Sequence, residues 1–127
     1  MPDAVHILVA EDEALAAMAI EDFLSRKGYR VTLAGDGLEA VERQRTDPAD
    51  VVITDLRMPR MDGRGLIREL RGMSPTLPVI VMTGYLAVES DDDALTNGAW
   101  HPLEILRKPV SPQAILDTLE RMLEAGA

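Results

Sequence analysis

Three carboxylates, one hydroxyl and one amine stand at or just after the ends of short apolar runs in this sequence. Glu11, Asp12 and Asp55 supply the carboxylates, Thr83 the hydroxyl and Lys108 the amine. Mg²⁺ binds carboxylate oxygens, and an ammonium group can neutralise the oxygens of a phosphoryl group. The five side chains therefore predict a site for one divalent metal ion and one phosphoryl group.

Each of these residues also has a structural interpretation. A lone Asp after a strand usually belongs to a turn, but Asp55 precedes a proline- and glycine-containing loop at residues 56–63 that favours a chemical role. Asp12 could cap a helix while Glu11 is solvated; two adjacent acids repel unless a cation is present, which favours the metal site. Lys108 alone would be a surface lysine, but its place before a proline after an apolar run favours the site.

Apolar runs alternate with helical patterns along the chain. We expect strands at residues 5–10, 30–34, 51–54, 78–83 and 105–107. We expect helices at residues 13–27, 37–45, 63–71, 90–97 and 111–124. Near-continuous apolar strands separated by helices predict an α/β fold, with a doubly wound parallel sheet covered on both faces. Ligands of such a sheet bind beyond the carboxyl ends of its strands, where the chemical candidates stand.

Local signals support several of these helices. Helical spacing in the first one is carried by Leu15, Met18, Ala19, Asp22 and Phe23. Expected stop and capping residues are Gly28, Asp36, Asp62 and Ser111, the last of these followed by Pro112 at the first helical position. These signals fix where we expect the helices to begin and end.

Composition limits the classes of function. The 127 residues predict one domain, residues 1–127, with no effector domain. With 22 acidic and 13 basic residues the net charge is −9, which argues against a nucleic-acid surface and against a basic membrane-binding patch. There is no cysteine, and we find no signal peptide and no apolar stretch long enough to span a membrane. We therefore expect a cytoplasmic protein.

These motifs together resemble the receiver domain of two-component response regulators, of the stand-alone type. The resemblance covers nearly the whole chain. It rests on the order and spacing of four markers: the acidic pair at 11–12, Asp-x-x-Met-Pro-x-Met-Asp-Gly at 55–63, Thr83-Gly84 and Lys108-Pro109. It implies a flavodoxin-like fold of five βα units, with the parallel strands in the order 2-1-3-4-5.

The resemblance also implies roles for the residues. Asp55 would accept a phosphoryl group from a histidine kinase or a histidine phosphotransfer protein. Mg²⁺ would be held by Glu11, Asp12, Asp55 and the backbone carbonyl of Arg57. Lys108 would neutralise the phosphoryl oxygens, and the Thr83 hydroxyl would read the phosphorylated state. The signal would pass to an unknown downstream protein, and any enzymatic activity would be limited to self-phosphorylation and autodephosphorylation. The bond before Pro109 would be cis.

The chain departs from the family pattern near its carboxyl end. Ile105 stands where an aromatic residue is usual, so a switch based on an aromatic ring is in doubt. Residues 100–104 look like a short insertion and carry the only tryptophan, Trp100. We expect Trp100 to cover the edge of the core; the alternative is a place on a partner-binding surface.

Other functions remain as alternatives. The chain could be a phosphorelay intermediate, a receiver from a hybrid kinase, or an unphosphorylated docking module. A phosphatase of the haloacid-dehalogenase type would need a second Asp at the position of Arg57. The acidic run 91–93 suits a solvated helix start, and His6 suits a packed structural histidine. A zinc site is not expected with two histidines and no cysteine.

Overall fold

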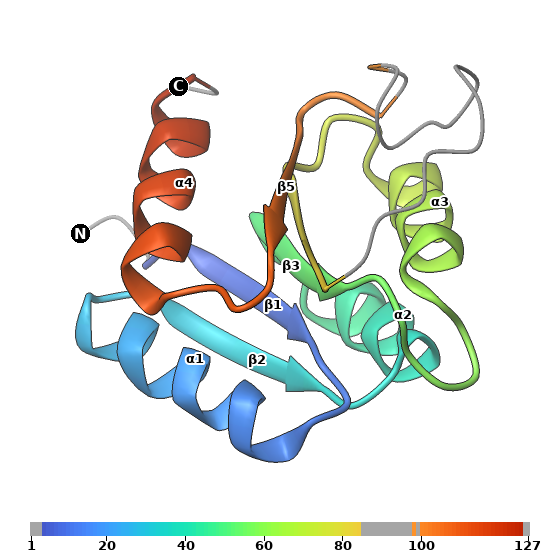
Figure 1. Ribbon diagram of the computed structural model, residues 1–127. Helices are drawn as coiled ribbons and strands as arrows, with labels where there is room; N and C mark the ends of the chain where they lie inside the picture. Colours follow the sequence, from blue (N-terminus) through green and yellow to red (C-terminus); the bar gives the residue numbers. More distant parts are fainter. Residues whose placement is uncertain (1–3, 85–97, 99, 126–127) are drawn as a thin grey trace.

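The computed structural model describes residues 4–84, 98 and 100–125. Five parallel strands form one sheet in the order β2-β1-β3-β4-β5, as the resemblance implies (Figure 1). The strands are β1 (His6–Ala10), β2 (Arg30–Ala34), β3 (Val51–Asp55), β4 (Val79–Thr83) and β5 (Leu103–Arg107). The helices are α1 (Ala14–Arg26), α2 (Gly37–Thr46), α3 (Gly63–Met73) and α4 (Pro112–Ala125). No helix in the described part of the chain has the length and apolar character needed to cross a bilayer.

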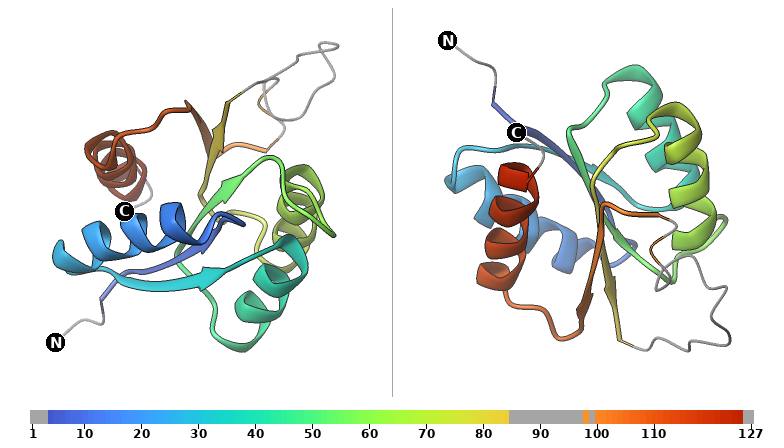
Figure 2. Two further views of the ribbon diagram at one scale, coloured as in Figure 1. Left: turned by 60° about the horizontal axis from the view of Figure 1, so that its bottom comes forward. Right: turned by 90° about the horizontal axis from the view of Figure 1, so that it is seen from above.

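Both faces of the sheet are covered by helices. Helices α1 and α4 lie on one face, and α2 and α3 lie on the other (Figure 2). Strands β1, β3 and β4 are buried along their whole length, because successive side chains point to opposite faces and each face meets a helix layer. This explains why these runs are continuously apolar rather than alternating.

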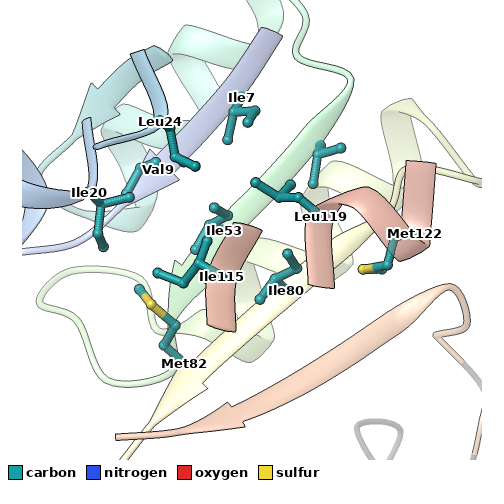
Figure 3. Close-up of a cluster of buried hydrophobic side chains, with 11 residues drawn as sticks. Ile7, Val9, Ile20, Leu24, Ile53, Ile80, Met82, Ile115, Leu119 and Met122 are labelled. Atoms are coloured by element: carbon teal, nitrogen blue, oxygen red, sulfur yellow. The ribbon is translucent and has the colours of Figure 1, made fainter. Parts of the chain in front are cut away.

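The larger core lies between the sheet and helices α1 and α4. Alternate strand residues such as Ile7, Val9 and Ile53 meet Leu24 of α1 and Leu119 of α4 there (Figure 3). All five of these side chains are fully buried. Removing this surface from water contributes roughly 25 cal/mol for each Å² of apolar area, so this layer holds the two central strands and their carboxyl ends in place.

On the opposite face the core is divided into two clusters. Leu8 and Val52 pack with Leu66 and Leu70 of α3 and with side chains of α2. A second cluster, made of Leu56, Ile67, Val79 and Val81, is covered in part by Trp100, Leu103 and Ile105. Trp100 is therefore a half-buried side chain at the edge of the core, as expected.

The helix ends follow the local signals in the sequence. Asp36 accepts a hydrogen bond from the amide of Glu39 at 2.8 Å, and Asp62 accepts one from the amide of Gly65 at 2.8 Å. Ser111 accepts one from the amide of Ala114 at 3.1 Å, with Pro112 opening α4. Gly28 adopts φ 96° just after α1, a conformation that costs glycine no Cβ clash. These capping predictions are confirmed.

Three details differ from the sequence expectations or lie outside the described residues. Helix α1 buries Ala17, Ile20 and Leu24, while Leu15 and Met18 are exposed, so the spacing that indicated the helix does not mark its buried face. Strand β5 begins at Leu103 rather than 105, because its first two residues pair with the start of β4; part of the expected insertion is thus strand. The helix expected at 90–97 and the acidic run 91–93 lie outside the described residues.

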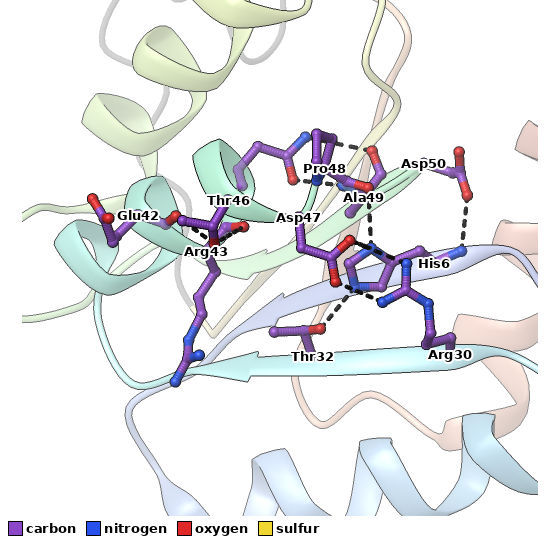
Figure 4. A network of polar contacts seen from close by, with 11 residues as sticks. His6, Arg30, Thr32, Glu42, Arg43, Thr46, Asp47, Pro48, Ala49 and Asp50 are labelled. Atoms are coloured by element: carbon purple, nitrogen blue, oxygen red, sulfur yellow. Dashed lines mark hydrogen bonds and ion pairs between the residues drawn. The ribbon is translucent and has the colours of Figure 1, made fainter.

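His6 is a structural residue at the amino-terminal edge of the sheet. Its buried ring donates from Nδ1 to the carbonyl of Pro48 at 3.1 Å and accepts at Nε2 from the hydroxyl of Thr32 at 2.7 Å (Figure 4). Beside it, Arg30 and Asp47 form a two-pronged ion pair at 2.6 and 3.2 Å. Because both ring nitrogens have partners, the imidazole can be buried without an unsatisfied polar atom.

Candidate functional site

The carboxyl ends of β1 and β3, which are neighbours in the sheet, bring three acids together. One carboxylate oxygen from each of Glu11, Asp12 and Asp55 lies within 4.8 Å of the others. Glu11 and Asp55 are 3% and 7% exposed, whereas Asp12 is open to solvent. Burying two carboxylates so close to a third is unfavourable unless cations or hydrogen-bond donors compensate them.

Lys108 supplies part of that compensation from the other side of the site. Its Nζ lies 2.7 Å from Oδ2 of Asp55 and 3.7 Å from Oε2 of Glu11. Its backbone amide donates to the carbonyl of Thr83 at 2.9 Å, which ties the residue after β5 to the end of β4. The lysine is thus held by its own backbone at the position from which its side chain reaches the acids.

Hydrogen bonds fix both carboxylate oxygens of Asp55. Oδ2 accepts from Lys108, and Oδ1 accepts from the backbone amide of Arg57 at 3.1 Å. The next residue, Leu56, donates its amide to the carbonyl of Met82 at 3.2 Å and so continues the pairing of β3 with β4 past the strand end. The Asp55 carboxylate is therefore oriented by donors on two sides.

Electrostatics in the site shift two pKa values. Burial raises the pKa of Glu11, and the nearby charges of Asp55 and Asp12 act in the same direction; the amide of Glu13, which donates to Glu11 at 3.1 Å, and the charge of Lys108 oppose them. For Lys108, burial disfavours the charged form. The hydrogen bond to Asp55 and the charges of Glu11 and Asp55 outweigh that effect, so the pKa of Lys108 is raised. Lys108 is accordingly a cation at neutral pH.

The residues fit a hard divalent cation. Within the described ranges, Glu11, Asp12 and Asp55 are the only group of three or more acidic, histidine or cysteine side chains close enough to share one ion. All three offer carboxylate oxygens, which suit Mg²⁺ and not a thiophilic metal. With all groups ionised, three carboxylates and one ammonium leave two negative charges uncompensated, which equals the charge of one such ion.

Thr83 and Arg57 lie beside this group. Thr83 is the last residue of β4, 2% exposed, in the strand that borders β3. Arg57 is exposed in the loop after Asp55. All six residues that the sequence singled out thus lie at or just after the carboxyl ends of the strands. Direct contacts join Lys108 to the two buried acids, Glu11 and Asp55.

Ile105, which stands where the family usually has an aromatic residue, is a packing residue in the structure. Ile105 is half-buried and packs against the second cluster on the α2–α3 face, as an aliphatic residue of an edge strand. The Lys108–Pro109 bond is cis, as the resemblance implies, and so is the bond between His101 and Pro102.

Some contacts of the site were not expected from the sequence. The glycine at 63 lies so close to the strand end that a Cβ built on it would stand 2.7 Å from the carbonyl oxygen of Asp55 and 2.8 Å from the Cα of Leu56. Arg60 and Asp36 join the loop after β3 to the start of α2. Gly63 was visible in the motif, but the partner of Arg60 depends on the strand order and carries no local signal.

Comparison with known proteins agrees with this geometry. The protein-family model of the response regulator receiver domain matches residues 7–120. The transcriptional regulatory protein ZraR of Escherichia coli K12 is 36% identical over 95% of this chain and 27% of its own length. The response regulator MprA of Mycobacterium tuberculosis H37Rv is 34% identical over 94% of this chain and 51% of its length. The chain thus spans about a quarter to a half of these curated relatives.

Solved structures give the same result. A response regulator receiver protein from Sinorhizobium medicae is 30% identical, with a TM-score of 0.82 and 97% of both chains covered. The chemotaxis protein CheY4 of Vibrio cholerae is 28% identical, with a TM-score of 0.82, over 93% of this chain and 98% of that one. The match to the family model decides against a phosphatase of the haloacid-dehalogenase type. The chain belongs to the response regulator receiver domain family.

Proposed function

We propose that this chain accepts a phosphoryl group on Asp55 from a phosphohistidine of a histidine kinase or a histidine phosphotransfer protein, with Mg²⁺ bound beside it. The observation that supports this most is the placement of Asp55. Its buried carboxylate lies among two further acids, which follow the neighbouring strand β1, and one lysine, which follows β5. A carboxylate needed only for structure would not require the two neighbouring acids, which raise the cost of burying it.

The chain's own residues can carry out the transfer. A carboxylate oxygen of Asp55 attacks phosphorus; the bond from phosphorus to the donor imidazole breaks, and its electron pair stays on the imidazole nitrogen. Such transfers depend on positioning and on neutralising the equatorial oxygens. Lys108, now 2.7 Å from Asp55, is within reach of those oxygens. When bound by Glu11, Asp12, Asp55 and the carbonyl of Arg57, Mg²⁺ supplies positive charge to the phosphoryl oxygens.

Output follows from the same residues. Once Asp55 carries a phosphoryl group, Thr83 can donate its hydroxyl to one oxygen while Lys108 pairs with another. Both residues are backbone-linked through the bond from the Lys108 amide to the Thr83 carbonyl, so a shift in one moves the other. We propose that this rearrangement changes what a downstream protein binds, and that the chain also hydrolyses its own acyl phosphate.

The larger protein context is part of the proposal. Two relatives are named as a transcriptional regulatory protein and a response regulator, and both are longer than this chain. A single receiver domain over residues 1–127 can act alone, as a phosphorelay intermediate or within a hybrid kinase. The acidic surface still predicts that these residues do not themselves bind nucleic acid.

Intact mass spectrometry tests the acceptor. After incubation with acetyl phosphate and Mg²⁺, the wild type should gain one phosphoryl group and Asp55→Asn none. Asp47→Asn, at the opposite edge of the sheet, is the matched control and should be labelled like the wild type. Labelling that persists in Asp55→Asn would contradict the proposal.

A further inference from the structure

The loop between Asp55 and α3 is fastened to α2 at a point away from the acids. The guanidinium group of Arg60 holds Oδ2 of Asp36, with Nε at 3.0 Å and Nη2 in closer contact. Asp36 uses its other oxygen, Oδ1, to cap α2 through the amide of Glu39. One carboxylate therefore joins the loop after β3 to the first turn of α2.

The backbone conformation of Arg60 agrees with an anchoring role for this ion pair. Its φ of 68° is positive, and Arg60 is the one non-glycine residue with positive φ in the described part of the chain. A non-glycine backbone in this left-handed region is strained. Such a conformation persists where surrounding contacts hold it, and the ion pair to Asp36 is one such contact.

A second contact lies beside the ion pair. Gly37, the buried first residue of α2, faces Met61 so closely that a Cβ built on the glycine would overlap the Met61 carbonyl oxygen and lie 2.6 Å from its Cβ. The loop thus rests on α2 with its backbone, with no space for any other side chain at position 37.

The other end of the loop is fixed at the strand. Gly63 donates its amide to the carbonyl of Leu56 at 2.8 Å and packs against the backbone of Asp55. Arg57 lies in the loop between Leu56 and the contacts at residues 60–61, and its amide donates to Oδ1 of Asp55. The position of the Arg57 backbone is thus set by Gly63 on one side and by the ion pair on the other.

We propose that Arg60 and Asp36 are positioning residues whose ion pair holds the loop after Asp55 in the conformation that binds the divalent cation. This inference rests on the proposed function of the acidic site. The pair does not touch the acids, so it acts through the loop backbone. We expect its effect to be mainly local: the Arg60 side chain is 60% exposed, while that of Asp36 is 14% exposed, and an ion pair open to solvent at one partner contributes only modestly to global stability.

A purely electrostatic effect of the ion pair and a positioning role predict opposite changes in Mg²⁺ affinity for Arg60→Gln. Arg60→Gln removes a positive charge, which by electrostatics alone would strengthen Mg²⁺ binding. Asp36→Asn removes a negative charge, which alone would weaken it, and keeps a good helix cap. Positioning by the ion pair predicts that both variants bind Mg²⁺ more weakly. Arg68→Gln, the same chemical change at an exposed residue of α3, is the control for charge.

The experiment is a Mg²⁺ titration of each full-length variant followed by backbone amide shifts. Arg60→Gln and Asp36→Asn should each raise the dissociation constant on the order of threefold to tenfold, below the 10–100-fold that partners of metal ligands show. The double variant should lose no more than the single ones, because one interaction is removed. Urea unfolding should show all variants folded.

Each other outcome has a clear meaning. Tighter binding by Arg60→Gln, or affinities for Arg60→Gln and Arg68→Gln that agree, would overturn the positioning role while leaving the proposed function intact. Losses in the two single variants that add in the double variant would also overturn it. Absence of Mg²⁺ binding at Glu11, Asp12 and Asp55 in the wild type would overturn the proposed function itself.

Discussion

Gly63→Ala tests the account of how the strand end and the loop fit together. The added Cβ would stand 2.7 Å from the Asp55 carbonyl oxygen and 2.8 Å from the Leu56 Cα. Ordinary contact begins near 3.4 Å, so backbone atoms must move by about 0.6–0.7 Å. They cannot rotate away as a flexible side chain would, because they belong to the backbone of the last residue of β3 and of the residue after it.

The magnitude follows from two opposing effects. Overpacking of this kind typically costs about 1–3 kcal/mol, whereas replacing a helical glycine by alanine gains at most about 1 kcal/mol. We expect Gly63→Ala to lower the free energy of unfolding by roughly 2 kcal/mol, because the nearest atoms all belong to the backbone of Asp55 and Leu56. In the same helix, Gly72 has open space at its Cβ position, so Gly72→Ala should be neutral or stabilising by up to about 1 kcal/mol.

Urea unfolding followed by far-ultraviolet circular dichroism measures both variants. The slopes with denaturant should agree with the wild type, so that the midpoints report stability. Gly63→Ala should also weaken Mg²⁺ binding, since the movement falls on Asp55. If Gly63→Ala proved as stable as Gly72→Ala, with unchanged Mg²⁺ affinity, the tight contact between Gly63 and the strand end would be refuted.

Three further predictions concern other parts of the molecule. The pKa of Glu11 is raised above its ordinary 4.5, so just above that pH the native state holds more protons than the unfolded state. Without Mg²⁺, the free energy of unfolding should therefore fall as pH rises from 4.5 through the raised pKa. Glu11→Gln should abolish that fall, as urea unfolding at several pH values will show. Ile105→Ala should cost about 1–3 kcal/mol of stability, below the range for a fully buried residue, because Ile105 is half-buried. It should leave the effect of a phosphoryl mimic on partner affinity intact, whereas Thr83→Ala should lose that effect. The reverse result would rule out that the Thr83 hydroxyl reads the phosphoryl group. His6→Phe removes the hydrogen bonds to the Pro48 carbonyl and the Thr32 hydroxyl, each worth about 0.5–1.5 kcal/mol, and should cost about 1–3 kcal/mol in thermal or urea unfolding. An unchanged midpoint would contradict the structural role.

Much of the site could be predicted because strand ends carry a strong local signal. Runs such as 51–54 are continuously apolar because both faces of the sheet are covered. The residue after such a run must lie at the sheet edge. In a parallel sheet all the carboxyl ends lie on one side, and the strand order that the resemblance implies brings Glu11, Asp12, Asp55 and Lys108 together there. Helix caps at Asp36 and Asp62 were predictable for the same reason, since they depend on three or four residues in sequence.

Features that depend on distant neighbours could not be predicted. The amphipathic spacing of α1 fits more than one face, and only the position of the sheet selects Ile20 and Leu24 over Leu15 and Met18. The start of β5 at Leu103 depends on its pairing with Val79. The ion pair between Arg60 and Asp36 joins residues 24 apart, and neither residue type at its position indicates the other.

Locating the acyl phosphate tests the central claim most directly. Borohydride reduces an aspartyl phosphate to homoserine, so phosphorylation with acetyl phosphate and Mg²⁺, reduction and peptide sequencing by mass spectrometry will identify the modified residue. The site described above predicts homoserine at position 55 and at no other Asp. Homoserine elsewhere in the chain, or none at position 55 although the protein gains a phosphoryl group, would contradict the assignment of Asp55 as the acceptor.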